Sequence, residues 1–119
     1  MTDTYDDYEL DPEEADVPAA PRKTIYEVFN PEGTVGVACD RDGEVVGMHI
    51  TDEARENGDV WLAAEIVALA KLAHMQSRVG LRREMEAKGT RPYTIDSFGL
   101  PTEAAYRALE NETFGTRAH

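Results

Sequence analysis

The sequence predicts an α+β fold in which a three-stranded antiparallel meander is covered by one long helix and followed by a short C-terminal helix. Two tight-turn signals within residues 24–50 predict the meander, because each joins two short runs rich in β-branched and aromatic residues. An apolar pattern of helical spacing from about residue 59 predicts the helix. A chain of 119 residues and 13.2 kDa suffices for one domain, which we place at residues 23–119.

Residues 1–22 are predicted to form a disordered acidic arm. Before Pro21 this segment holds eight acidic residues and no Lys or Arg, with few large aliphatic side chains. Such a segment buries too little apolar area to offset the entropy of ordering it. Two interpretations stay open: a solubilising tail, or a recognition peptide that folds against a basic surface with Tyr5, Tyr8 and Leu10 as its anchors.

The three strands are expected at residues 24–30, 34–39 and 44–50. Turns between them are supplied by Pro31-Glu32-Gly33 and Arg41-Asp42-Gly43. Asp-Gly is a strong hairpin signal, because the central turn residues must tolerate positive φ. Three strands alone would leave one apolar face in water, so the meander needs a cover from downstream.

The cover is a helix that begins near Asp59 and continues to Gly89, a natural C-terminal stop. Its apolar residues at helical spacing are Leu62, Ile66, Leu69 and Ala73. A helix of nearly thirty residues is about 45 Å long, which is more than three short strands cover. Either Gly80 breaks the helix or its distal half meets a second chain, and we favour the second explanation. Residues 90–101 are expected to form a loop and residues 102–113 a last helix.

The charge of the chain limits the classes of function. It carries 12 Lys and Arg against 24 Asp and Glu, a formal net charge of −12 at pH 7. This excess of acid disfavours coating of nucleic acid and adhesion to an anionic membrane. No run of about 18 apolar residues occurs, so no membrane span is predicted. The first residues are acidic where a secretory signal would be basic and then apolar, so a cytoplasmic location is expected.

Residue types that carry catalysis or bind metals are sparse. Cys39 is the only cysteine, so no intrachain disulfide or cysteine zinc site is predicted, and we expect a small core residue. The histidines lack paired metal-ligand spacing, and structural roles are expected for His49, His74 and His119. Residues 40–44 lack the length and the closing Glu of a calcium loop, so we assign them to the hairpin turn. The chain is therefore not predicted to be an enzyme, and no cofactor or metal site is predicted.

A partner-binding surface is predicted on the long helix. The basic residues concentrate there, at Arg78, Arg82, Arg83 and Lys88. They form either a solvated helix face or a dock for phosphate or for an acidic peptide, including the chain's own arm. Because aromatic and arginine side chains tend to anchor interfaces, the candidate surface combines apolar residues with a polar arginine rim. It consists of Trp61, Leu81 and Met85 with Arg78 and Arg82.

Several short motifs, taken in order, resemble those of a known family. They are Leu62-Ala63-x-Glu65-Ile66, Ala70-x-Leu72-Ala73, Gly99-Leu100-Pro101 and Glu112-x-Phe114-x-Thr116-Arg117, preceded by the strand block of residues 25–50. Over about residues 24–118 the chain is similar to the mycobacterial EspD/EspH-like proteins associated with ESX, or type VII, secretion. The order of elements also looks distantly similar to the YbaB-like nucleoid-associated proteins.

The resemblance implies a non-enzymatic accessory role. It suggests a chaperone-like adaptor that binds a secretion substrate or another protein partner and forms a homodimer. Export by a type VII route is the alternative location, and a YbaB-like DNA-binding protein is the alternative function. A nucleic-acid partner is disfavoured because of the net negative charge, and no membrane partner is expected.

Overall fold

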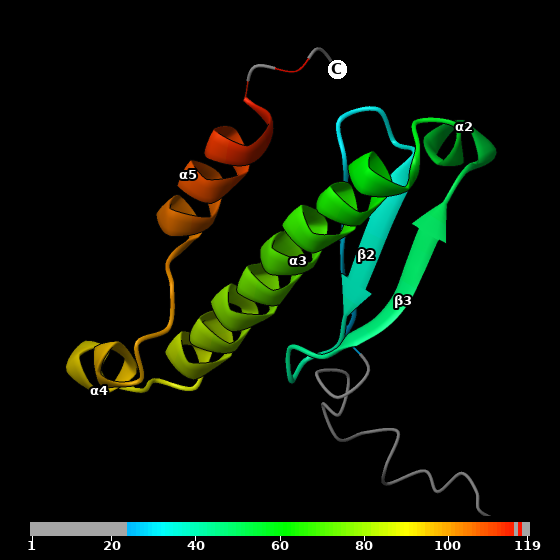
Figure 1. Cartoon of the computed structure of the whole chain (residues 1–119). Coiled ribbons are helices and arrows are strands. Elements are labelled where there is room, and N and C mark those ends of the chain that lie inside the picture. The colour runs from blue at the N-terminus through cyan, green and yellow to red at the C-terminus, as the bar shows by residue number, and fades with distance from the viewer. Residues whose placement is uncertain (1–23, 116, 118–119) are drawn as a thin grey trace, which may run out of the picture.

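The structure is a computed structural model that describes residues 24–115 and 117; the predicted acidic arm lies outside them (Figure 1). Three strands come first, and four helices follow. Their bounds are β1 Tyr26–Phe29, β2 Val35–Cys39, β3 Val45–Ile50, α2 Asp52–Arg55, α3 Asp59–Ala87, α4 Pro92–Ser97 and α5 Glu103–Phe114. The predicted α+β arrangement of a meander, a long helix and a short C-terminal helix is confirmed.

The sheet is antiparallel throughout and has the strand order β1-β2-β3. Every residue of the central strand β2 is buried, and its side chains Val35, Val37 and Cys39, which face one side of the sheet, are fully buried. Both predicted turns exist, and each contains a glycine with positive φ: Gly33 at 74° and Gly43 at 88°. The predicted hairpins are therefore confirmed.

Helix α3 packs on β1 and β2, whereas α5 lies alongside α3 on the side away from β3 (Figure 1). The buried side chains Leu69, Leu72 and Ala73 form the helix part of the core. The edge strand β3 receives little cover, and its side chains Val45, Val46 and Met48 are 50–58% exposed.

Gly80 does not break α3, which runs unbroken for 29 residues. The glycine is buried because the hydroxyphenyl ring of Tyr26 lies directly against it: a Cβ at this position would overlap the Tyr26 hydroxyl and ring carbons. Burial raises the pKa of Tyr26 above its usual value of 10.0, with Glu84 adding to the effect. The glycine therefore allows the start of β1 to approach the helix closely.

The segment predicted as a loop, residues 90–101, contains the helix α4. Pro92 stands in its first turn, where a missing N–H costs nothing, and Ile95 is fully buried. Arg82 ties this segment to α3, because its Nη2 donates to Asp96 Oδ1 at 2.8 Å and its Nη1 to the Leu100 carbonyl at 3.0 Å. The chain itself therefore covers part of the distal half of α3, and the length of the helix does not require a second chain. Homodimer formation stays a prediction.

We expect Gly80→Ala to lower the free energy of unfolding by about 1–3 kcal/mol, the usual cost of overpacking a core. The cost should outweigh the gain in helix propensity of about 1 kcal/mol that Ala brings over Gly. Urea unfolding measures the effect. In a Tyr26→Ala background the ring is gone, so the same substitution should become stabilising. A Gly80→Ala protein more stable than the wild type would contradict the close packing.

Candidate functional site

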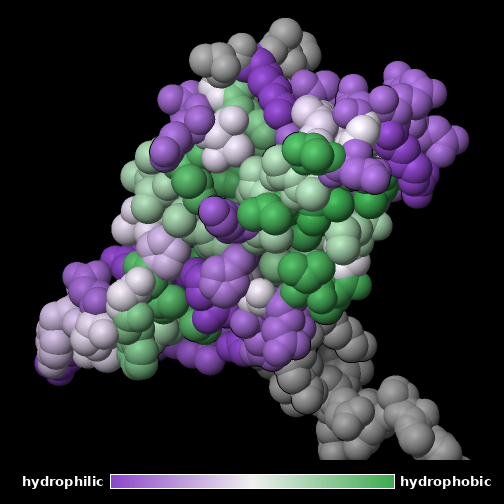
Figure 2. Space-filling view, viewed as in Figure 1, coloured by the Kyte–Doolittle hydropathy of each residue, from purple (hydrophilic) through white to green (hydrophobic). Residues whose placement is uncertain are grey.

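An open groove of about 700 Å³ runs along the exposed face of α3, between the β2–β3 hairpin and the segment that joins α4 to α5. We call it the α3 groove. Its apolar lining comes from three parts of the chain: Val45, Val67, Ala70, Met75, Pro101 and Leu109. On this side of the molecule, hydrophobic surface gathers over β3 and α3 and is interrupted by hydrophilic side chains along the helix (Figure 2).

Three basic side chains lie in this lining, and no carboxylate does. They come from successive turns of α3, because Lys71, His74 and Arg78 are spaced by three and four residues. His74 Nδ1 lies 3.0 Å from the carbonyl oxygen of Gly43, and Arg78 Nη2 donates to the carbonyl of Arg41 at 2.7 Å. The hairpin therefore holds two of the three basic groups in place.

Most arginines in the part of the chain that the structure describes are paired with a carboxylate, but two basic side chains of the α3 groove, Lys71 and Arg78, are not. Six arginines there form ion pairs with carboxylates: Arg41, Arg55, Arg82, Arg83, Arg107 and Arg117. Within residues 24–115 and 117, Lys71 and Arg78 form no ion pair. The groove thus offers unpaired positive charge beside apolar surface in a strongly acidic protein.

Cys39 also lines the α3 groove but is fully buried, as expected for a small core residue. Burial raises the pKa of its thiol, and the neighbouring carboxylate of Asp40 raises it further. The unreactive thiol form is therefore favoured over the thiolate.

Neither a metal cluster nor a membrane span is found in the described ranges: no three His, Cys, Asp or Glu residues are grouped as metal ligands, and no helix is long and apolar enough to cross a bilayer. Asp40 Oδ1 instead accepts hydrogen bonds from the backbone N–H groups of Asp42 and Glu44, at 2.9 and 3.0 Å. The hydrogen bonds of this turn account for the acidic residues within 40–44 that look like part of a calcium loop. His49 lies on the sheet, where its ring packs edge-to-face with the ring of Phe29 and the two ring centroids are 5.8 Å apart.

The structure does not bring the predicted partner-binding residues together. Trp61 is half-buried against the core near the start of α3. Met85 follows 24 positions later, which is about 36 Å along the helix. Leu81 and Met85 are half-buried, and Arg82 is engaged with α4. Of the five residues only Arg78 lines the α3 groove; a role of any of the five in partner binding stays a prediction.

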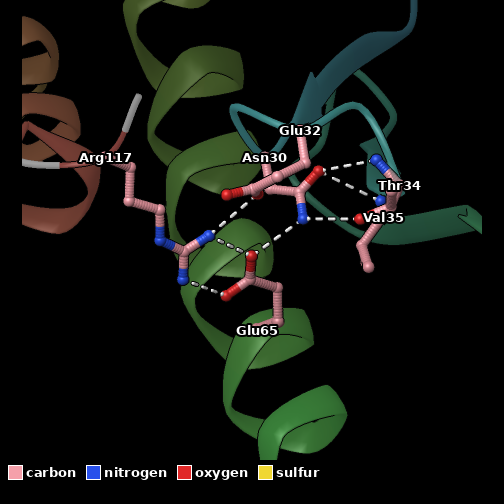
Figure 3. A network of polar contacts seen from close by, with 6 residues as sticks. All are labelled: Asn30, Glu32, Thr34, Val35, Glu65 and Arg117. Atoms are coloured by element: carbon pink, nitrogen blue, oxygen red, sulfur yellow. Dashed lines mark hydrogen bonds and ion pairs between the residues drawn. The ribbon is translucent and has the colours of Figure 1, made fainter. Parts of the chain in front are cut away.

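A buried polar network joins three distant parts of the chain around Glu65 (Figure 3). Glu65 is 4% exposed, and both its oxygens accept from Arg117, at 2.6 and 2.8 Å. Asn30 Nδ2 donates to the same carboxylate at 2.9 Å, while Asn30 Oδ1 accepts from the backbone N–H groups of Thr34 and Val35. The network therefore connects Asn30, between β1 and β2, and Arg117, three residues beyond the end of α5, to Glu65 on α3.

Hydrogen bonding by Arg117 lowers the pKa of Glu65 below its usual 4.5, against the opposing effect of burial. The sequence reasoning gave this residue no separate role. A signal was present, because Glu65 lies four and seven positions before Leu69 and Leu72 and so shares the buried face of the helix. An acid at such a position requires a buried partner.

The fold and the α3 groove define a small α+β protein with an open, partly apolar groove and no cluster of metal-ligating residues in its described part. The comparison with curated proteins finds a similarity to the class of ESX secretion-associated proteins. The chain is similar to the ESX-1 secretion-associated protein EspH of Mycobacterium tuberculosis, with 29% identity over an alignment of 140 positions, gaps included, that covers 97% of this chain and 76% of EspH. This similarity supports an EspH-like family, as the motifs predicted.

No protein-family model matches the chain. No solved structure matches it either, so the likeness to YbaB stays a prediction.

We expect Glu65→Gln to lower the free energy of unfolding at pH 7 by about 1–3 kcal/mol, because a buried charged hydrogen-bonding group is lost. Since the pKa of Glu65 is depressed in the folded protein, its stabilising effect is complete above the unfolded pKa. The effect disappears as the pH falls through the folded pKa. Urea unfolding of both proteins from pH 7 to pH 3 measures the difference.

The matched control is Glu110→Gln, which removes a carboxylate that pairs with Arg107 on the exposed surface of α5. Its effect at pH 7 should stay within about 0.5 kcal/mol. Arg117→Ala should cost more than Glu65→Gln, because it leaves the carboxylate of Glu65 buried without its cation. An equal or smaller cost would contradict the assignment of Arg117 as the compensating charge.

Proposed function

We propose that this protein is a non-catalytic, cytoplasmic adaptor of ESX (type VII) secretion that binds a protein partner, a secretion substrate, through the α3 groove. The observation that carries the proposal is the groove itself: apolar side chains with an unpaired basic rim, on a chain similar to EspH. Its chemistry suits an extended or helical segment that has apolar side chains and acidic neighbours.

The edge strand β3 extends this surface beyond the groove. Val45 belongs to both the strand and the groove lining, and Met48, further along the strand, is 58% exposed. An edge strand also offers unpaired backbone groups to an incoming chain. Apolar contact and backbone pairing together would cover an exposed segment of the partner until it is handed over.

The test is recovery of partners by the tagged full-length chain from the cytosol of its native cell, followed by mass spectrometry. Val67→Glu places a negative charge in the groove at a position that is 53% exposed, so folding should be preserved. Val60→Glu is the matched control, because the same change is made on the same helix at an 87% exposed position outside the groove.

The expected result is near-stoichiometric recovery of a secretion substrate by the wild type and by Val60→Glu, with recovery reduced about tenfold by Val67→Glu, a loss of roughly 1.4 kcal/mol. Equal recovery by all three proteins would refute the groove as the binding site. Recovery of nuclease-sensitive DNA, with binding that weakens steeply as salt rises, would replace the proposal with the YbaB-like alternative.

A further inference from the structure

We propose that the chain's own acidic arm docks into the α3 groove, so that the groove of the unliganded protein is occupied in cis. The proposal rests on the chemistry of the groove, on the composition of the arm and on where the arm begins. A further consequence, that the arm competes with a client, depends on the proposed function; the docking contact itself does not.

The arm and the groove are complementary in charge and in apolar character. Between Met1 and Pro21 the arm holds eight acids and no base. Lys71 and Arg78, about 10 Å apart along α3, form no ion pair with any described carboxylate. The apolar lining would take the arm's few large side chains, Tyr5, Tyr8 and Leu10.

The arm enters the described part of the chain close to the groove. Tyr26, near the start of β1, pairs with Cys39, which lines the groove. Two residues after Cys39, the carbonyl of Arg41 accepts the hydrogen bond from Arg78. The arm therefore begins near the Arg78 end of the groove.

The arm is also long enough. From Arg78 to Val67 the groove follows 11 residues of helix, about 17 Å, which an extended chain spans with about five residues. Residues 1–23 provide more than four times that length, so the arm can reach the groove and lie along it.

The sequence supplies a clean reporter of this contact, because the chain contains only three lysines: Lys23, Lys71 and Lys88. Lys71 lines the groove, and Lys88 caps the end of α3; both are exposed. Gly80 lies against Tyr26, with Lys71 nine residues before it and Lys88 eight residues after it. The two lysines are thus about 13 Å and 12 Å along the helix axis from the level of Tyr26, on opposite sides of it, and are matched in axial distance.

The experiment is carbodiimide cross-linking of the full chain alone, which joins carboxylates to lysine amines, with mass spectrometry of the products. A mixture of ¹⁴N- and ¹⁵N-labelled protein separates links within one chain from links between two. We expect intramolecular links from the arm acids to Lys71 to exceed those to Lys88 by about five- to tenfold. Val67→Glu should reduce the preference for Lys71 by a similar factor, because the new carboxylate in the groove repels the acidic residues of the arm. Val60→Glu should leave it unchanged.

Equal linking of the arm to Lys71 and Lys88 would overturn the proposal, as would a preference that survives Val67→Glu. Links to Lys71 that are mainly between isotopically different chains would also overturn docking in cis and assign the groove to the arm of a second copy. No client is present in this experiment, so its outcome is distinguishable from a failure of the proposed function.

Discussion

The length of α3 is the constraint on which the rest of the structure depends. A helix of 29 residues is about 44 Å long and exposes more apolar surface than three strands of four to six residues cover. The sheet packs against one side of the helix, and α4 and α5 pack against another. Between these two sides, the strip of α3 from Val67 to Arg78 is only partly covered by the described residues and forms the floor of the α3 groove. An open groove thus follows from an imbalance between one long element and several short ones.

The sheet and the long helix were predictable because their signals are local. Asp42-Gly43 specifies its hairpin through the conformation of two residues, and the spacing of Leu62, Ile66 and Leu69 specifies a helix face. The helix α4 was missed because six residues beginning at Pro92 carry too little periodicity, and its one buried anchor, Ile95, depends on tertiary contact. The break considered at Gly80 did not occur, because the glycine serves the approach of Tyr26.

The site was less accessible to sequence reasoning than the fold. Helical spacing can place Lys71, His74 and Arg78 on one face, yet only the structure shows which cations are paired. Arg82 and Arg83 face the α4–α5 side and are bound to Asp96 and Glu103, whereas Arg78 is bound to no acid among the described residues. The basic concentration predicted from residues 78–88 therefore divides into cations that hold α3 to the α4–α5 side and cations, among them Arg78, that no described carboxylate pairs. Pairing of this kind depends on residues 14 to 20 positions apart along the chain.

The network around Glu65 also has a consequence for the order in which the chain acquires its structure during synthesis. The ribosome delivers β1, β2 and α3 well before Arg117, so the nascent protein contains a buried acid that, among the partners in this network, only Asn30 can bind. Until Arg117 emerges, that carboxylate favours contact with water and opposes tight closure of helix on sheet. We therefore expect the domain to stay loosely assembled during synthesis until residue 117 emerges and connects the β1–β2 turn and the end of the chain through Glu65.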